Sequence, residues 1–325
     1  MSVSEIAVHL DAGGLADQLA HDVRAGLLAT PKVLPPKYFY DARGSELFDE
    51  ITRLEEYYPT RAESQILTQR AGQIARLTQA HTLVEIGSGT SEKTRLLLRA
   101  LSAAGSLRQF VPFDVDPVVL QGASVAVAAE FPAITVAPVV GDFEHHLDEL
   151  PASPRRLVAF LGSTIGNLDP RQRAEFLSNV RRGLATGDAF LLGVDLVKSP
   201  DRLVAAYDDS RGVTAEFNKN VLAVINRQLG ADFDLAAFEH KAVWDPGEEW
   251  IEMRLRSVRK QSVHVAALGL DVEFGAGEVL RTEISTKFRR DGVSEELSTA
   301  GLRLTQWWTD PAGDFALTLS EPSGA

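Results

Sequence analysis

The segment from Leu83 to Thr94 constrains the fold of this 325-residue chain more than any other part. A short apolar run ends at Gly87-Ser88-Gly89, and a stretch with helical character follows. A strand that runs through a Gly-x-Gly turn into a helix is typical of the first unit of an α/β nucleotide-binding sheet. The glycines let the backbone approach a ligand closely, and the helix N-terminus offers free N–H groups. The segment therefore predicts a ligand site at this turn.

The residues around the two glycines indicate which ligand is expected. Glu92 stands where a dinucleotide-binding fingerprint has its third glycine, and a carboxylate there would repel a pyrophosphate. Glu85, two residues before Gly87, instead favours a ligand that carries positive charge. The spacing Glu-x-Gly-x-Gly resembles the opening motif of S-adenosylmethionine-dependent methyltransferases, whose ligand has a sulfonium and an ammonium but no phosphate. A nicotinamide oxidoreductase is the weakest alternative, and a purely structural strand–turn–helix is another.

Strands and helices alternate from residue 82 to residue 195, which predicts a parallel sheet. The expected strands are 82–86, 109–113, 134–140, 156–160 and 189–194, and the expected helices between them end near residues 103, 130 and 184. Before this region, helical spacing predicts helices over 13–30 and 44–52. A third helix is expected to begin at the capping box Thr60-Arg61-Ala62-Glu63.

The alternation stops near residue 200. The later pattern predicts helical residues 203–229 broken near Gly212, antiparallel strands at 242–244, 250–258, 261–268 and 280–288, a helix at 293–300, a terminal hairpin of 303–309 and 315–319, and fraying over 320–325. We therefore expect an α/β fold, a Rossmann-like class I methyltransferase sheet formed by residues 61–199 and 287–325. Residues 1–60 and 200–286 are expected to form a second α+β domain, a substrate-binding lid inserted between strands five and six.

Composition excludes several classes of function. The net charge of −12 disfavours a nucleic-acid partner. The chain has no apolar run of 18 residues, and its first 20 residues do not resemble a signal peptide, so we expect no membrane partner and a cytoplasmic location. Without cysteine there is no thiolate ligand, and the adjacent His145 and His146 lack metal-binding spacing, so no metal is expected. We expect a monomer.

Polar residues at the ends of the predicted strands are the candidate contacts to S-adenosylmethionine. Asp114 is placed to accept hydrogen bonds from two ribose hydroxyls; the alternative, a helix cap, is better supplied by Asp116. Asp142 and Phe143 offer an acceptor and a ring edge to an adenine, although Phe143 alone would fit a core. Lys93 could reach a methionine carboxylate, the alternative being a solvated lysine. Glu85, Gly87 and Gly89 complete the set.

The segment after the fourth predicted strand indicates which class of methyl acceptor is expected. Many N-methyltransferases that act on nucleobases or amides have Asn/Asp-Pro-Pro-Tyr there, whereas this chain has Gly162-Ser163-Thr164-Ile165-Gly166-Asn167. Residues 31–41, 56–61, 161–168 and 307–310 together resemble the histidine-specific Nα-methyltransferase family of ergothioneine biosynthesis, over nearly the whole chain. The resemblance implies transfer of three methyl groups in succession to the α-amino group of L-histidine, giving hercynine.

The same resemblance implies roles for individual residues. The substrate carboxylate would be held by Asn167 and Tyr207, with Tyr57 closing the pocket, and the α-amino group would lie near Gly162 and Thr164. The imidazole would be bound by Glu283 and Ser285, with Met253 lining the pocket. Independently of the resemblance, the rings of Tyr40 and Phe48 could attract the methylated cation; we expect Tyr40 to do so and Phe48 to belong to the core. Glu283 and Ser285 share one face of a strand because side chains alternate. Without the resemblance, this segment would be interpreted as an ordinary exposed edge strand.

No residue is required as a general base, since a free α-amino group titrates near roughly 8. A proton path through Tyr40 and a water would suffice. Two alternatives remain at this stage: a methyltransferase for another amino acid or small amine, and a non-catalytic S-adenosylmethionine-binding or scaffold protein.

Overall fold

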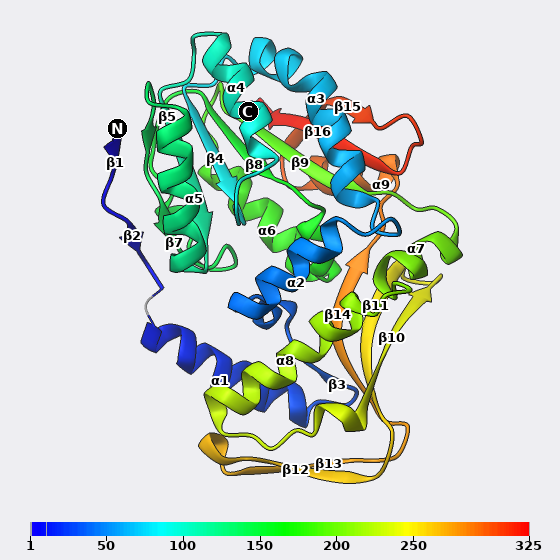
Figure 1. Ribbon diagram of the computed structural model, residues 1–325. Coiled ribbons are helices and arrows are strands. Elements are labelled where there is room, and N and C mark those ends of the chain that lie inside the picture. The colour runs from blue at the N-terminus through cyan, green and yellow to red at the C-terminus, as the bar shows by residue number, and fades with distance from the viewer. Residues whose placement is uncertain (1, 11, 325) are drawn as a thin grey trace. The chain divides into compact units, whose positions relative to one another are not determined.

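The computed structural model describes residues 2–10 and 12–324 (Figure 1). By contacts within the chain it divides into two compact units. Among the described residues, unit 1 contains 2–10, 59–196 and 288–324. Unit 2 contains 12–58 and 197–287.

Unit 1 is built on one large sheet. Its strands are β1 (Ser2–Val3), β2 (Ala7–Val8), β4 (Thr82–Ile86), β5 (Gln109–Asp114), β6 (Thr135–Val136), β7 (Val139–Val140), β8 (Arg156–Phe160), β9 (Ala189–Asp195), β15 (Leu302–Thr309) and β16 (Phe315–Pro322). The order is β1-β6-β5-β4-β8-β9-β16-β15, and β7 pairs with both β5 and β2. All pairs are parallel except those made by β16, which runs antiparallel to β9 and β15. The predicted α/β sheet and its terminal hairpin are confirmed.

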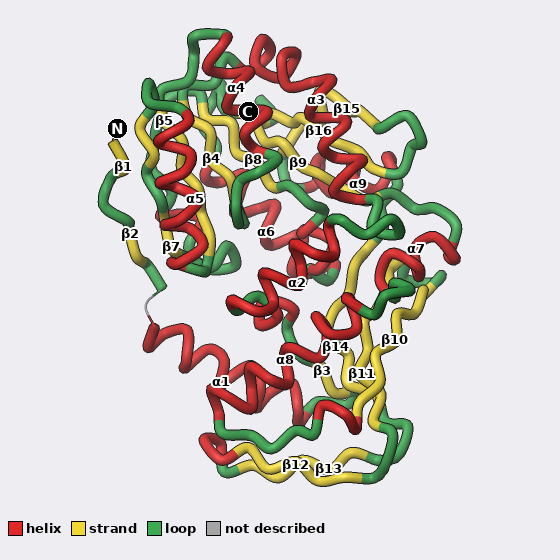
Figure 2. The backbone as a smooth tube through the Cα atoms, viewed as in Figure 1, coloured by secondary structure: helices red, strands yellow, loops and turns green. Residues whose placement is uncertain are grey.

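Helices cover both faces of this sheet (Figure 2). One face is covered by α3 (Pro59–Thr78), α4 (Thr94–Ala103) and α5 (Pro117–Glu130). The other face is covered by α6 (Pro170–Gly183) and α9 (Arg290–Thr299). The strands are buried on both faces, so their residues alternate between two cores: Leu83 packs with α3 and α4, whereas Val84 and Ile86 pack with α6 and α9. This arrangement explains the continuous apolar runs that predicted the strands.

The strand predicted over residues 134–140 is interrupted. β6 and β7 both pair with β5, but Ala137 and Pro138 separate them. Proline has no N–H to donate to a ladder, so the strand breaks there. The carbonyls of Val136 and Pro138 accept hydrogen bonds from Ser4 and Ala7 at 2.8 and 3.1 Å, which brings the first residues of the chain to this edge.

Unit 2 combines helices with a smaller sheet. Its helices are α1 (Ala12–Leu28), α2 (Ala42–Thr52), α7 (Pro200–Tyr207) and α8 (Val213–Leu229), and its strands are β3 (Lys32–Val33), β10 (Phe238–Asp245), β11 (Trp250–Ser257), β12 (Gln261–Val265), β13 (Leu270–Phe274) and β14 (Val279–Thr286). The sheet order is β10-β11-β14-β3, and β12 and β13 form a separate hairpin. Short 3₁₀ turns complete the chain at Pro36–Phe39, Leu147–Glu149, Thr164–Asn167, Leu235–Ala237 and Ala266–Leu268.

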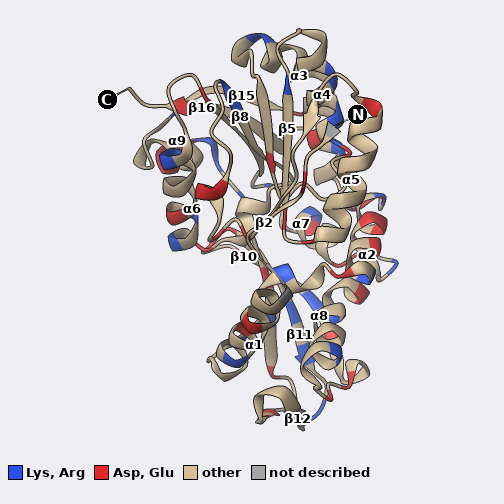
Figure 3. Cartoon of the chain, turned by 90° about the vertical axis from the view of Figure 1, so that its left-hand side faces the viewer, with Lys and Arg blue, Asp and Glu red and all other residues tan. Residues whose placement is uncertain are grey.

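Charged residues of both signs share the exposed faces of several helices, including α2 and α6 (Figure 3). On α2, Arg43 pairs with Glu46 at 3.2 Å and Glu50 at 3.9 Å, and all three side chains are solvent-exposed. These ion pairs lie on the solvent-exposed face of α2, while Leu47 and Ile51 on the opposite face pack in the core of unit 2.

Other sequence predictions also differ from the structure. Residues 2–10 add strands to the sheet of unit 1, although 1–60 were assigned to the second domain. Strand β13 was not predicted, although the apolar–polar alternation of Leu270–Phe274 is typical of a half-buried strand. The terminal strand continues to Pro322, so fraying over Ser320–Pro322 is wrong, and Ala325 lies outside the described residues. The capping box at Thr60 is also wrong, since α3 begins at Pro59 and Glu63 has other partners.

Candidate functional site

The glycine turn after β4 is open toward a ligand. Gly87 has φ +66° and Gly89 has φ +47°, a backbone region that favours glycine. The N–H groups of Gly87 and Ser88 are tied to the Phe113 carbonyl at 2.9 and 3.1 Å. A Cβ added at Gly89 would meet no heavy atom of the described chain within 4 Å. Helix α4 begins at Thr94, and Lys93 is its N-cap residue.

Glu85 is a buried carboxylate with one unsatisfied oxygen. Its Oε1 accepts a hydrogen bond from the Thr94 hydroxyl, while its Oε2 has no partner among the described residues. Burial raises the pKa of Glu85 to about 7, and the hydrogen bond from Thr94 acts in the opposite direction. An orphaned buried acceptor normally has a partner in the working state of a protein. Glu85 therefore fits a ligand that brings a cation or N–H donor to this turn.

Asp114 ties the end of β5 to the glycine turn. Its Oδ2 accepts from the Gly89 N–H at 2.8 Å and its Oδ1 from the Asp116 N–H at 3.1 Å. Burial raises the pKa of Asp114, and these backbone hydrogen bonds partly offset the effect. Asp116 caps α5 through the N–H groups of Val118 and Val119, as its sequence predicted. Asp114 is therefore not the helix cap, and its carboxylate lies at the turn.

Asp142 and Phe143 follow β7, next to the end of β5 in the sheet. Asp142 is buried, and its Oδ1 accepts from the Glu144 N–H at 2.9 Å. The half-buried Phe143 ring packs against Phe160 and Phe176, with centroid distances of 5.3 and 5.7 Å. Much of this ring therefore belongs to the core, and its contact to an adenine stays a prediction.

Glu63 is a site residue that sequence reasoning missed. Its fully buried carboxylate accepts a hydrogen bond from the Lys93 ammonium. The Gly162 N–H also donates to it and lies 2.9 Å from Oε1 and 3.0 Å from Oε2. One carboxylate thus joins a predicted cofactor residue to a predicted substrate residue. Gly193 of β9 leaves the space for it, because a Cβ there would lie 2.2 Å from Glu63 Oε1.

This close approach predicts the effect of Gly193→Ala. The added methyl must displace the Glu63 carboxylate and loosen its ion pair with Lys93, so we expect the free energy of unfolding to fall by about 1–3 kcal/mol, the cost of overpacking. Urea denaturation measures the change. The matched control is Gly122→Ala on α5, where a Cβ meets nothing within 4 Å. Alanine is the better helix former, so the control should be neutral or slightly stabilising, and equal behaviour of the two variants would contradict the role given to Gly193.

The loop after β8 has a left-handed turn at Gly162 (φ +77°) and Ser163 (φ +60°). The Ser163 hydroxyl accepts from the Asp195 N–H at 2.9 Å, which joins the ends of β8 and β9. The Thr164 hydroxyl donates to the Leu161 carbonyl at 3.2 Å. Gly162, Thr164 and Asn167 are all half-buried, so these predicted substrate residues lie at the same sheet edge as Glu85 and Asp114.

In unit 2, three predicted substrate residues lie on adjacent strands. Met253 of β11 is directly opposite Glu283 of β14, and Ser285 follows two residues later on the same face. Glu283 is half-buried, whereas Met253 and Ser285 are 2% and 3% exposed. The Tyr207 hydroxyl of α7 lies 2.8 Å from Ser285 Oγ. The structure therefore brings Tyr207 and Ser285 together, with Glu283 as the neighbour on the strand.

The predicted aromatic contacts of unit 2 form one cluster. The Tyr40 ring meets Phe48 at 5.5 Å and Phe217 at 5.4 Å, and Phe48 meets Tyr57 at 6.1 Å, in edge-on geometry. Tyr57 in turn lies 6.4 Å from Tyr207. Tyr40 is 40% exposed, whereas Phe48 is partly buried against the core of unit 2. Tyr40 therefore presents the more accessible ring, and its contact to a methylated cation stays a prediction.

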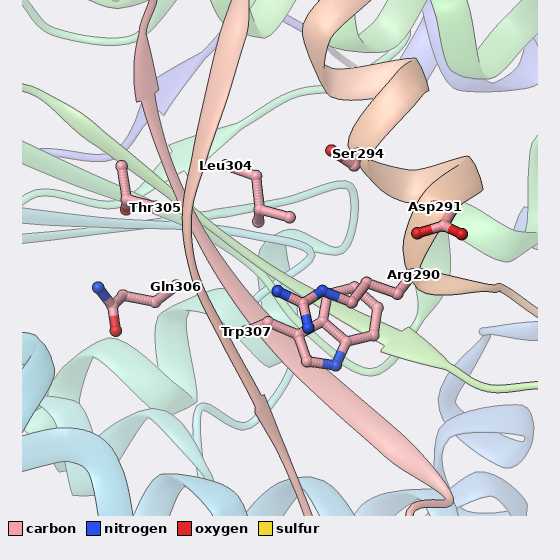
Figure 4. Close-up of a pocket in the computed structure, with 7 residues that line it drawn as sticks. All are labelled: Arg290, Asp291, Ser294, Leu304, Thr305, Gln306 and Trp307. Carbon is pink, nitrogen blue, oxygen red and sulfur yellow. The ribbon is translucent and has the colours of Figure 1, made fainter.

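A cavity of about 430 Å³ lies elsewhere in unit 1, against α9 and the edge strand β15 (Figure 4). Its lining includes Arg290 and Trp307, with the guanidinium 5.8 Å from the ring centroid. Strands β8, β9 and β16 separate β15 from β4. This cavity contains none of the predicted site residues, so the candidate site is the one at the glycine turn.

Neither a metal site nor a membrane-spanning helix is found among the described residues. Within the part of the chain that the structure describes, no three His, Asp or Glu side chains converge in a way that could hold a metal ion. Over the same residues, none of the helices has the length and hydropathy needed to span a bilayer.

A mostly parallel sheet with an open glycine turn, an unsatisfied carboxylate and acids at successive strand ends defines an α/β ligand-binding protein whose site lies at the carboxyl ends of its strands. A family model described as histidine-specific methyltransferase, SAM-dependent, matches residues 19–322. The chain belongs to this family, and is therefore a methyltransferase that uses S-adenosylmethionine.

Curated relatives agree with this assignment. A histidine N-alpha-methyltransferase of Mycolicibacterium smegmatis is 61% identical over 315 residues, which cover 97% of this chain and 98% of that protein. One from Mycobacterium tuberculosis is 58% identical over 317 residues, with the same coverage of both chains. Ergothioneine biosynthesis protein 1 of Neurospora crassa is 29% identical over 304 residues, which cover 86% of this chain and 32% of that protein.

Proposed function

We propose that this protein transfers three methyl groups in succession from S-adenosylmethionine to the α-amino group of L-histidine, giving hercynine for ergothioneine biosynthesis. The observation that carries the proposal is the 58–61% identity to two histidine N-alpha-methyltransferases over 97% of the chain. The alternatives of a scaffold protein and of a nicotinamide enzyme have no comparable support.

Unit 1 is proposed to hold the cofactor. When bound, S-adenosylmethionine supplies an electrophilic methyl group on its sulfonium. The orphaned Glu85 oxygen and the open space at Gly89 fit its positively charged amino-acid end and a close backbone approach. Asp114 would accept from ribose hydroxyls, Asp142 and Phe143 would contact the adenine, and Lys93, held by Glu63, would face the methionine carboxylate.

Unit 2 is proposed to be the substrate-binding domain inserted between β9 and the terminal strands. Glu283 would accept the imidazole N–H and Ser285 would bond the second ring nitrogen, with Met253 beside them. Tyr207 would bind the carboxylate, Tyr57 would pack against Tyr207, and Tyr40 would attract the methylated ammonium by its ring quadrupole. From unit 1, Asn167 is assigned to the carboxylate, and Gly162 and Thr164 to the α-amino group.

The main catalytic task of these residues would be to position the substrate amine relative to the methyl group. The amine loses a proton near neutral pH without a strong base, so holding its lone pair in line with the methyl supplies most of the acceleration. Tyr40 and a water are the proposed proton path. The cytoplasmic, monomeric state stays a prediction from the sequence.

The raised pKa of Glu85 predicts a proton linkage. A carboxyl with a pKa of about 7 is mostly protonated at pH 6, and a cationic ligand beside it lowers this pKa. S-adenosylhomocysteine retains the ammonium, so its binding at pH 6–7 should release a fraction of a proton. Calorimetry in buffers of different ionisation enthalpy measures this release. Glu85→Gln should abolish it, and a release that is the same in this variant would contradict the role of Glu85.

The proposed function is tested directly by mass spectrometry of the purified protein with S-adenosylmethionine and a panel of free amino acids and small amines. A trimethylated product from L-histidine alone is expected. Methylation of a different amine would keep the cofactor and remove the roles of Glu283 and Ser285. Absence of any product, with S-adenosylhomocysteine still bound, would leave a binding protein.

A further inference from the structure

We propose that Lys287 is a positioning residue that makes the enzyme selective for a substrate with a free carboxylate. It acts through Tyr207, whose hydroxyl it polarises and fixes. The proposal rests on the function proposed above, because it concerns how the same pocket distinguishes an amino acid from the corresponding amine.

Lys287 is a buried lysine at the end of β14, only 2% exposed. Its Nζ lies 2.8 Å from the Tyr207 hydroxyl and 2.8 Å from Ser285 Oγ. The two hydroxyl oxygens are themselves 2.8 Å apart, so the three groups form a triangle. The ammonium also lies 4.5 Å from the Tyr207 ring centroid. A main-chain hydrogen bond from the Lys287 N–H to the Glu249 carbonyl at 2.8 Å continues the ladder and fixes where the side chain starts.

The donors and acceptors of this triangle determine what it offers a ligand. An ammonium only donates, so both hydroxyl oxygens accept from Lys287. Either hydroxyl can be the donor of the bond between them, and because Tyr207 is assigned to the substrate carboxylate, the proposal has Ser285 donate to Tyr207. The Tyr207 hydroxyl proton can then donate to an acceptor outside the triangle. Lys287 thereby makes the Tyr207–Ser285 pair a hydrogen-bond donor to whatever lies beside it.

The charge of Lys287 adds a preference for an anion. A hydroxyl that accepts from a cation is a stronger donor, and donation to a carboxylate is stronger than donation to a neutral group. Both effects are enhanced where water is excluded, as around a side chain 2% exposed. In L-histidine the anionic group is the carboxylate, which histamine lacks while it keeps the imidazole and the amine. Lys287 should therefore matter for histidine and much less for histamine.

The test compares wild type with Lys287→Met and Lys287→Gln, which have similar length and no charge. Calorimetry in the presence of S-adenosylhomocysteine measures the affinities for L-histidine and for histamine. We expect both variants to lose about 10-fold or more in histidine affinity and less than about 3-fold in histamine affinity. In kinetics, KM for histidine should rise more than kcat falls, because the carboxylate is bound equally in ground and transition states. Unchanged S-adenosylhomocysteine affinity verifies that the variants are folded.

Parallel losses for histidine and histamine would assign Lys287 a merely structural role and overturn the proposal, as would unchanged affinities for both. A wild-type protein that does not bind L-histidine would instead overturn the proposed function itself. The two failures are distinguishable, because the first requires normal histidine binding by the wild type.

Discussion

Replacement of Glu283 by alanine is expected to lower kcat/KM for L-histidine by about 100-fold. The carboxylate is the proposed acceptor for the imidazole N–H, and a hydrogen bond to a charged group typically contributes about 1.5–3 kcal/mol. The ring N–H would then lose its proposed acceptor beside the buried Met253 and Ser285. Steady-state kinetics with quantification of methylated products measures the loss.

The matched control for this variant is Glu239→Ala. Glu239 belongs to β10 of the same sheet, but it is exposed and pairs with Arg256 at 2.5 Å. Exposed ion pairs contribute little, so activity within about twofold of wild type is expected. Normal histidine turnover by Glu283→Ala would show that the imidazole is recognised by other residues.

Asp114→Ala is expected to weaken the binding of S-adenosylhomocysteine by about 100- to 1,000-fold. The substitution removes the proposed acceptor for two ribose hydroxyls, and each charge-assisted hydrogen bond accounts for roughly a factor of 10 or more. It also frees the Gly89 N–H that now donates to Asp114 at 2.8 Å, so the glycine turn loses an anchor. Isothermal titration calorimetry measures the affinity.

Asp116→Ala separates affinity from stability. Asp116 caps α5 and makes no contact to the glycine turn through its side chain in the hydrogen bonds described. Loss of an N-cap costs about 1 kcal/mol, whereas the affinity for S-adenosylhomocysteine should stay within about threefold. Equal losses of affinity in the two variants would refute a direct role for Asp114.

The strands of unit 1 could be predicted from the sequence because they are buried on both faces. Thr82–Ile86 and Arg156–Phe160 are apolar runs bounded by turns, and both were predicted with their observed bounds. The proximity of Glu85 and Asp114 could be predicted for a related reason, because parallel strands place their carboxyl ends at one sheet edge.

The residues that the sequence did not reveal depend on tertiary neighbours. Glu63 follows Thr60 with capping-box spacing, and only the approach of Lys93 and Gly162 shows where its carboxylate goes. Lys287 at the end of a strand would ordinarily be solvated, yet it is buried against Tyr207. The two-residue strands β1 and β2 carry no periodicity to detect, and only pairing with β6 and β7 defines them.

The division of unit 2 between two distant stretches of sequence has a consequence for synthesis on the ribosome. Helix α1 buries Leu19 and Val23 in a core that is completed by α8, and β3 pairs with β14 through Lys32 and Leu280. At 5–20 residues per second, the partner strand of β3 is made roughly 10–50 s later. During that interval unit 1 can begin to fold, while the apolar face of α1 lacks the part of its core that α8 supplies. The early segment is therefore the part of this chain for which a chaperone would matter most.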